Sequence, residues 1–400
     1  MSELSYLEKL LDGVEVEWRN LGDTSLFEIA NNGRKPVKAS LRIAGETPYY
    51  GANNIQDYVD GYTHDGEYVL IAEDGSASLE NYSIQYATGK FWANNHVHVV
   101  RGKERVHSRF LYHYLCIVNF LPFLTGGGRA KLTKGQLIEI PVPIPCPDNP
   151  EKSLAIQSEI VRILDKFTAL TAELTAELTM RKKQYNYYRD QLLSFEEGEV
   201  EWKTLGDIGD VRMCKRILKN ETLPEGDVPF YKIGTFGKKA NAFISRDVFE
   251  AYKNKYSFPK KGDVLISASG TIGRTVIYDG EPAYFQDSNI VWLENDESIV
   301  TNKYLWHFYK IAKWAVSEGG TIDRLYNDNI RKTKIIVPYP SDPSKSLAEQ
   351  NRVVAILEKF DALTSSISEG LPREIELRQK QYEYYRDLLF SFPKPEAASN

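Results

Sequence analysis

The segment SLAIQ (153–157) begins a helical pattern that continues through ILDKF (163–167), ALT (169–171) and KQYNYYRD (183–190). The same pattern returns as SLAEQ (346–350), ILEKF (356–360), ALT (362–364) and KQYEYYRD (380–387). A self-similarity of this length predicts a molecule built from two similar halves. We therefore expect it to meet a target that also has two halves.

The segments between the helices repeat at their edges. VEWRNLGD (16–23) matches VEWKTLGD (200–207), and the N-terminal YLEKLL (6–11) resembles YRDQLL (188–193), the end of the first helical segment. The N-terminus therefore resembles the end of a third, truncated helix, and the order of elements is nearly circular. The sequence predicts five parts: an N-terminal domain over 1–147 with a short helix at 1–12, a first helix over 148–197, a second domain over 198–343, a second helix over 344–392 and a flexible tail over 393–400.

The two domains share a skeleton and differ in their loops. PYY (48–50) resembles PFY (229–231), VLI (69–71) resembles VLI (264–266), and GGG (126–128) resembles GG (319–320). Short β-branched and aromatic runs broken by Gly, Asn and Asp predict strands and loops. The expected fold class is α+β: two α/β domains separated by two long helices that pack as an antiparallel coiled coil, with a pseudo-twofold internal repeat. Similar frames with different loops favour one task performed on different targets.

The apolar positions of the first helix follow coiled-coil spacing. One array starts at Ile160 and a second at Leu178, and an additional four-residue step joins them within the tandem TAELTAEL (171–178). About forty residues at ~1.5 Å each give a rod of roughly 60 Å. The second copy is four residues longer between its arrays and contains GLP (370–372), where we expect a break.

A proline-rich segment precedes each helix. These segments are IPVPIPCP (140–147) and IIVPYP (335–340). Closely spaced prolines force an extended backbone and cannot lie inside a helix, so we interpret both segments as linkers that lead from a domain into a helix. Asp148 and Asp342 lie where the turn before each helix is expected.

The composition narrows the class of protein. Hydrophobic residues make up 42% of the chain, an ordinary value for a globular protein. The net charge of −5 argues against nonspecific coating of DNA but leaves room for local basic surfaces. The 3 cysteines form no CxxC pair, which fits a reducing cytoplasm and offers no zinc framework. No window approaches eighteen consecutive apolar residues, so we expect no membrane span.

The motifs of three catalytic classes are incomplete. DNPE (148–151) lacks the second proline and the aromatic residue of an amino-methyltransferase loop, and GTIGRT (270–275) is too short for a phosphate-binding loop. EWK (201–203) resembles part of a nuclease motif, but its repeat partner EWR (17–19) lacks the lysine. His96 and His98 alternate as in a strand without a third ligand. The sequence therefore predicts no catalytic residue and no metal site.

The paired repeats together resemble one family closely. QYxYYRD in each helix and EVEW(K/R)xLGD at the start of each domain are similar to the specificity subunit of a type I restriction-modification system, over essentially the whole chain. The resemblance implies that each domain is a target-recognition domain for one part of a split site in double-stranded DNA. It also implies that the two helices pack antiparallel and set the distance between the parts.

The resemblance implies partners as well. Two modification subunits would dock along the helices, carrying S-adenosylmethionine and the chemistry of adenine-N6 methylation, and restriction subunits that use ATP and Mg would join them. The chain itself would bind no cofactor and would work in a bacterial or archaeal cytoplasm. Two alternatives stay open at this stage: a scaffold whose domains bind proteins, and an enzyme in its own right.

Base reading requires side chains that fork onto base edges, presented by loops on a rigid frame. Candidates in the first domain are Tyr50, Asn53, Asn54, Gln56, Ser76, Asn94, Asn95, Arg129 and Lys131. Candidates in the second domain are Lys232, Lys238, Lys239, Ser269, Thr271, Arg274, Gln286, Ser288, Thr321 and Arg324. The alternative for each single residue is that it is only solvated; for each cluster we favour DNA contact.

The QYxYYRD motifs supply candidates for partner binding: Tyr187, Arg189, Tyr384 and Arg386. Tyr187 and Tyr384 lie off the apolar stripe of their helices. The tyrosines that follow the stripe, such as Tyr185 and Tyr382, are interpreted as helix-packing residues instead.

Overall fold

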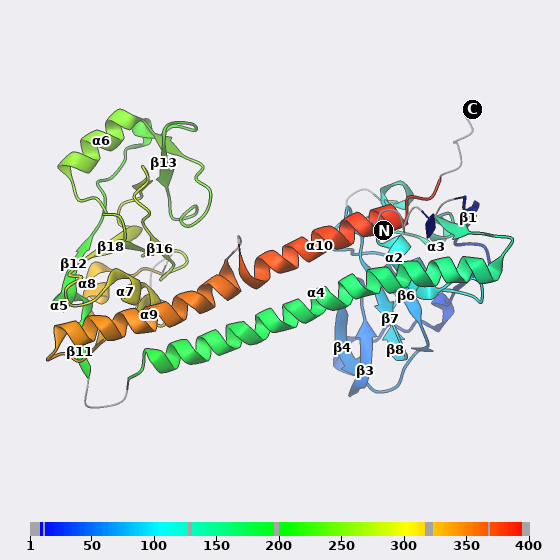
Figure 1. Cartoon of the computed structure of the whole chain (residues 1–400). Helices are drawn as coiled ribbons and strands as arrows, with labels where there is room; N and C mark the ends of the chain where they lie inside the picture. The colour runs from blue at the N-terminus through cyan, green and yellow to red at the C-terminus, as the bar shows by residue number, and fades with distance from the viewer. Residues whose placement is uncertain are drawn as a thin grey trace. The chain divides into compact units, whose positions relative to one another are not determined.

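The computed structural model describes residues 9–10, 13–126, 130–195, 200–316, 323–366 and 369–393. It divides into two units (Figure 1), one formed by Met1–Leu174 with Glu374–Asn400 and the other by Thr175–Arg373. These units differ from the predicted parts, because each combines one domain with segments of both helical regions. The expected helix at 1–12 and tail at 393–400 lie almost entirely outside the described residues.

The first unit contains two four-stranded sheets. One has the order β2-β9-β6-β7, formed by β2 (Phe27–Ile29), β9 (Val97–Gly102), β6 (Tyr68–Ala72) and β7 (Ile84–Ala87). The other has the order β4-β3-β8-β5, formed by β4 (Ile55–Val59), β3 (Ala44–Tyr50), β8 (Lys90–Ala93) and β5 (His64–Asp65). All pairings are antiparallel except that of β3 with β8. Every residue of β6 is buried, which explains its uninterrupted apolar sequence.

The second unit repeats the strand order of the first sheet, and its second sheet has three strands where the first unit has four. One sheet has the order β12-β18-β15-β16, formed by β12 (Gly209–Arg212), β18 (Ile290–Asn295), β15 (Val264–Ser267) and β16 (Thr275–Ile277). The other has the order β14-β13-β17, formed by β14 (Phe243–Ile244), β13 (Val228–Tyr231) and β17 (Tyr284–Phe285), and β13 pairs with β17 in parallel. The predicted common skeleton is therefore confirmed at the level of strand order.

The proline-rich segments are strands, so their interpretation as linkers was wrong. β10 (Pro141–Pro145) pairs antiparallel with β1 (Val16–Asn20), and β19 (Lys334–Pro338) pairs in the same way with β11 (Val200–Thr204). The prolines of β10 occupy alternate positions, so the N–H groups between them remain available; Cys146, next in that series, donates to the carbonyl of Glu15 at 2.8 Å. Prolines are tolerated in such a ribbon because the N–H that they lack would face away from the partner strand.

The first long helix, α4 (Pro150–Leu192), is continuous. The Asn149 side chain, rather than that of Asp148, accepts from the N–H of Lys152 at its start. The second helical region consists of α9 (Pro343–Ser365) and α10 (Gly370–Leu389), and Asp342 caps α9 as predicted. The predicted break is confirmed at Gly370, where φ is +75° and an added Cβ would lie 2.4 Å from the carbonyl oxygen of Ala362.

Aromatic pairs mark where the long helices meet inside each unit. In the first unit Phe167 stacks on Tyr385, with 5.3 Å between ring centroids, and in the second unit Tyr188 stacks on Phe360 at 5.8 Å. In each unit the pair joins α4 to a helix of the second helical region, and the antiparallel coiled coil stays a prediction.

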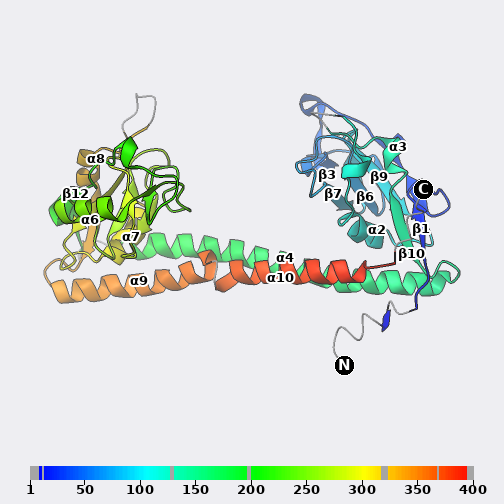
Figure 2. The same ribbon diagram turned by 90° about the horizontal axis from the view of Figure 1, so that it is seen from above.

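The hydrophobic core of each domain contains residues from both helical regions. The first core takes Ile160 from α4 together with Leu389, the last residue of α10, and Phe390, which follows it. The second core takes Leu357 from α9 together with Leu193, which follows α4. In the first unit the strands and α2 lie on one side of α4 and α10 (Figure 2). The near-circular order of the sequence thus corresponds to two cores that are built from equivalent segments of the chain.

Matched polar contacts attach each domain to its helix. Gln157 accepts from the N–H of His107 at 2.9 Å and donates to the carbonyl of Arg105 at 3.1 Å. Gln350 makes the equivalent bonds with Thr301 and Ile299, both at 2.9 Å. Both glutamines are fully buried, so each bond satisfies a group that water cannot reach.

Short helices complete the two units. They are α2 (Ser108–Leu115), α3 (Lys134–Leu137), α5 (Leu205–Ile208), α6 (Arg246–Lys255), α7 (Asn302–Tyr309) and α8 (Asn327–Lys332).

On α2, the buried His113 lies 2.8 Å from a carboxylate oxygen of Asp165 on α4. Burial lowers the pKa of His113 to about 4, although the bond to Asp165 acts in the opposite direction.

Candidate nucleic-acid interface

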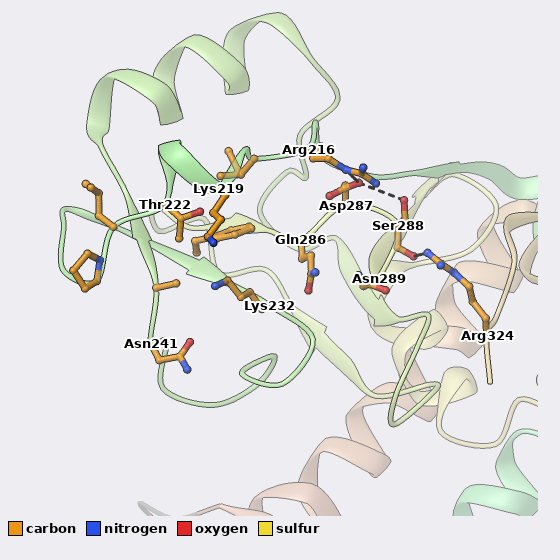
Figure 3. A pocket seen from close by; sticks show the side chains of 15 residues that line it. Arg216, Lys219, Thr222, Lys232, Asn241, Gln286, Asp287, Ser288, Asn289 and Arg324 are labelled. Carbon is orange, nitrogen blue, oxygen red and sulfur yellow. Dashed lines mark hydrogen bonds and ion pairs between the residues drawn. The ribbon is translucent and has the colours of Figure 1, made fainter. Parts of the chain in front are cut away.

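Polar loops of the second domain line a hollow of about 660 Å³ (Figure 3). We call it the second-domain hollow. Its lining includes four basic side chains, one carboxylate and several amides and hydroxyls: Arg216, Lys219, Thr222, Lys232, Asn241, Gln286, Asp287, Ser288, Asn289 and Arg324. Such an excess of positive charge suits an anionic polymer, because phosphate contacts supply most of the affinity of proteins for nucleic acids.

The loop 286–289 forms one side of this hollow. Gln286 donates its backbone N–H to Tyr231, and its side-chain oxygen accepts from the N–H of Ile233, both at 2.9 Å. Ser288 has φ of +59°, a conformation that costs a serine about 1 kcal/mol. Its carbonyl accepts from Arg324 at 3.1 Å. Predicted residues Gln286, Ser288 and Arg324 are therefore brought together, and their contacts hold the loop in its shape.

The loop after β15 lies beside it and is less open than predicted. Ser269 is 8% exposed and donates its hydroxyl to Asn289 at 2.7 Å, so the side chain supports the hollow instead of lining it. Arg274 donates to the carbonyl of Phe236 at 3.1 Å and to the Thr271 hydroxyl at 3.4 Å. These contacts assign Ser269 and Arg274 to the framework of the loops.

Besides Ser269, Thr271 and Arg274, two further described candidates, Lys238 and Lys239, are absent from the lining of the hollow. Lys238 and Lys239 are exposed, and Lys238 lines a separate cavity of about 260 Å³. Lys232, by contrast, lies in the hollow with its ammonium 5.9 Å from the ring centroid of Phe230. Thr321 lies outside the described residues.

In the first domain, amide side chains join the equivalent loops to one another. Asn53 donates to the carbonyl of Gly75 and accepts from the N–H of Ala77, both at 2.8 Å, which ties the β3–β4 turn to the loop after β6. Ser76 donates to Ser78 at 2.7 Å. Asn94 is 4% exposed and accepts from the N–H of His96 at 2.8 Å.

The prediction that Asn94 faces DNA is therefore wrong, because its side chain is buried and its oxygen accepts from the backbone of His96. Of the other candidates, Asn54, Gln56 and Asn95 are exposed and Tyr50 is half-buried at the end of β3. Arg129 lies outside the described residues.

The first-domain loops carry balanced charge. Glu73 binds Arg34 at 2.6 Å and Lys131 at 3.0 Å, and Asp74 lies 2.5 Å from His96. Burial alone would raise the pKa of Glu73, but hydrogen bonds from Arg34 and Lys131 outweigh it and lower the pKa. Lys131 keeps 46% of its side chain exposed although it is paired with Glu73. The two domains thus offer different surfaces on the same frame.

Backbone contacts show that these loops are equivalent. An isolated bridge joins Asp74 to Lys131 in the first domain, and another joins Ser269 to Arg324 in the second. Lys131 and Arg324 therefore occupy corresponding places. The N–H of Asn94 donates to Tyr50 as that of Gln286 donates to Tyr231, at 3.3 and 2.9 Å.

Sequence reasoning missed several residues of the second-domain hollow: Arg216, Lys219, Thr222, Asn241 and Asn289. One signal was present, because RMCKRILK (212–219) carries four basic residues in eight. The stretch has no counterpart in the shared skeleton, and that is why a comparison of the two halves passed over it.

The QYxYYRD motifs have the same geometry in both units. Tyr187 and Tyr384 are 62% and 55% exposed, as predicted. Each meets the next tyrosine edge to face, with ring centroids 5.4 and 5.3 Å apart at 75°. The side chains of Arg189 and Arg386 are only 16% and 20% exposed, and each lies 5.7 Å from the ring of Tyr185 or Tyr382. The tyrosines, more than the arginines, are accessible to a partner.

The described part of the chain offers neither a membrane span nor a cluster of metal ligands. In that part, no helix is both long and apolar enough to cross a bilayer. Nor do its histidine, cysteine and carboxylate side chains gather into a group of three or more that could hold a metal ion.

The chain contains two copies of one mixed domain. Each copy has polar loops at the same place and is attached to long helices, so the class is that of a duplicated, two-domain protein with two equivalent loop surfaces. The chain also matches the model of the type I restriction modification DNA specificity domain twice, over residues 14–180 and 197–377. The chain belongs to this family.

Several relatives agree in length as well as sequence. The chain is 64% identical to a putative type I restriction enzyme specificity subunit of Haemophilus influenzae, over 97% of this chain and 98% of that one. It is 40% identical to the EcoR124I/EcoR124II specificity subunit of Escherichia coli, over the full length of both. The crystal structure of the S subunit of a type I restriction-modification system from M. genitalium shares the fold, with a TM-score of 0.58 and 15% identity over 96% of this chain and 98% of that one.

Proposed function

We propose that each domain binds one part of a split DNA site, so that the chain acts as the sequence-reading subunit of a type I restriction-modification complex. One observation carries this proposal: the same strand order presents the same loops twice, with a basic hollow in one domain and a charge-balanced cluster in the other. Equivalent loops of different chemistry are what two different half-sites require.

We also propose the partners. Two modification subunits dock on the two QYxYYRD motifs, with Tyr187 and Tyr384 at the contacts, because these motifs present one geometry twice. In this proposal the modification subunits hold S-adenosylmethionine and methylate adenine at N6, and restriction subunits supply ATP- and Mg-dependent cleavage. The specificity chain holds no cofactor and is not itself catalytic, and the complex works in the cytoplasm.

The long helices complete the proposal by setting the gap between the half-sites. The continuity of α4 over 43 residues supports this role, since a helix without a break transmits changes in its length and rotation. Two major-groove readers on one face of B-DNA are expected about one helical turn, roughly 34 Å, apart.

The test is duplex binding by the chain co-purified with its modification subunit. We expect sequence-specific, salt-sensitive binding that is lost when either half of the site is scrambled. A protein-interaction scaffold would bind all duplexes equally or none. The enzyme alternative predicts methyl transfer or cleavage by the isolated chain, whereas we expect neither.

A further inference from the structure

Arg216 at the edge of the second-domain hollow is bound to Asp287 through its Nε atom alone. Its Nε donates to Oδ2 of Asp287 at 2.9 Å, and 70% of its side chain is exposed. The two terminal nitrogens of its guanidinium have no partner among the described residues. Figure 3 shows Arg216 beside Asp287 on the same side of the hollow as Ser288. Such an exposed ion pair contributes little to stability.

Asp287 is a fixed anchor for this guanidinium. Only 15% of its side chain is exposed, and it lies within the loop 286–289, which hydrogen bonds to Tyr231, Ile233 and Arg324 hold in place. Its carbonyl accepts from the N–H of Asn289 at 2.7 Å, and the neighbouring Ser288 adopts its positive φ while its own carbonyl is bound by Arg324. Fixing Asp287 in this way fixes the direction of Arg216.

The pair has the hydrogen-bonding pattern of a G·C reader. An arginine anchored through Nε directs its two terminal nitrogens outward, and this fork fits O6 and N7 of guanine. Oδ1 of Asp287 has no hydrogen bond to any described residue, and a carboxylate oxygen accepts from the N4 amino group of cytosine. A phosphate is a poorer ligand here, because the carboxylate would repel it.

Other basic side chains of the hollow suit phosphates better. Lys219 and Lys232 are exposed and form no ion pair with a described carboxylate. At the place of Asp287, the first domain has Asn95, which makes no such pair with an arginine. The Arg216–Asp287 pair is therefore particular to the second domain, as a determinant of one half-site must be.

We propose that Arg216, positioned by Asp287, reads a G·C base pair in the half-site of the second domain. This inference rests on the proposed function and assigns a base pair to one site within it. Lys219 and Lys232 contact the DNA backbone beside that base pair.

The experiment uses the complex of the full chain with its modification subunit. The wild-type methylome gives the motif, and binding is then measured on duplexes with each base pair of the second half-site replaced in turn. We expect one invariant G·C pair. Arg216→Ala lowers the discrimination at that pair by about 5- to 150-fold and leaves the other positions unchanged. Arg216→Lys keeps the charge but not the fork, so it relaxes the same position; Asp287→Asn does so too.

Two control variants separate this reading from general charge effects. Arg212→Ala removes an exposed arginine of the same stretch that is paired with Glu294 outside the hollow, and it should leave the motif unchanged. Lys219→Ala should weaken binding to all sequences alike and reduce the salt dependence by about one phosphate contact.

The inference is overturned if Arg216→Ala and Arg216→Lys leave the motif unchanged. It is also overturned if Arg216→Ala behaves like Lys219→Ala, with a uniform loss, since Arg216 would then contact a phosphate. A wild-type complex with no split motif would instead overturn the proposed function and this inference together.

Discussion

Removing one four-residue unit from α4 changes the length of the proposed spacer without touching either core. Residues 171–174, one copy of TAEL, are exposed or half-buried, and none of them belongs to a described hydrophobic core. The boundary between the two structural units follows Leu174. The deletion should therefore preserve both domains and their attachment to the helices.

The size of the effect follows from helix geometry. Four residues at ~1.5 Å shorten the helix by about 6 Å, and four steps of ~100° rotate its end by ~40° beyond a full turn. With base pairs about 3.4 Å apart, the shortening corresponds to roughly one or two base pairs. We predict that the gap between the half-sites shrinks by that amount and that the half-sites stay the same.

Methylome sequencing of cells that co-express the modification subunit measures both quantities at once. A matched control replaces residues 171–174 by four alanines, which keeps the helix length and should keep the gap. An unchanged gap in the deletion variant, with methylation intact, would refute the role of the helix as a spacer. A changed half-site would refute the independence of the two domains.

Three other predictions follow from single contacts. Phe390→Ala should destabilise the first unit by about 3–5 kcal/mol and leave the second unit's denaturation midpoint unchanged, because Phe390 packs only in the first core; two-transition unfolding curves check this. Replacing Tyr187 and Tyr384 together by Ala should weaken capture of the modification subunit by roughly tenfold per site without shifting the melting temperature, as pull-down titration and calorimetry would measure. Burial lowers the pKa of His113 to about 4, so the neutral imidazole contributes to stability above pH ~6.5. That contribution is lost as the pH falls towards 4, and the free energy of unfolding decreases by about 3 kcal/mol. His113→Gln should make the free energy of unfolding less dependent on pH in this range, as denaturation at several pH values would measure.

The sequence predicted the long-range order of the fold because repeats report it directly. The two helical segments, the break at Gly370 and the common skeleton of the domains are all confirmed. Segments 140–147 and 335–340 were misjudged as linkers because proline content was weighed without the alternation that leaves intervening N–H groups free for pairing. Pairing with a strand more than a hundred residues away leaves no local signal.

The sequence predicted which loops carry polar side chains better than it predicted which of those side chains are exposed. Loops at the ends of equivalent strands bring Gln286, Ser288 and Arg324 to one hollow, and their contact with DNA stays a prediction. Whether an amide faces solvent or closes a turn depends on neighbours distant in sequence, and so Asn94 was misassigned. Arg216 was missed because its importance comes from Asp287, 71 residues away, and not from its surroundings in the sequence.

The central claim is that two domains each read one half of a split DNA site. Methylome sequencing of a host that expresses this chain with its modification subunit, and no other methyltransferase, tests it most directly. We predict one motif with two fixed parts separated by a gap of fixed length and free sequence. A single continuous motif, or methylation that requires only one of the two domains, would contradict the claim.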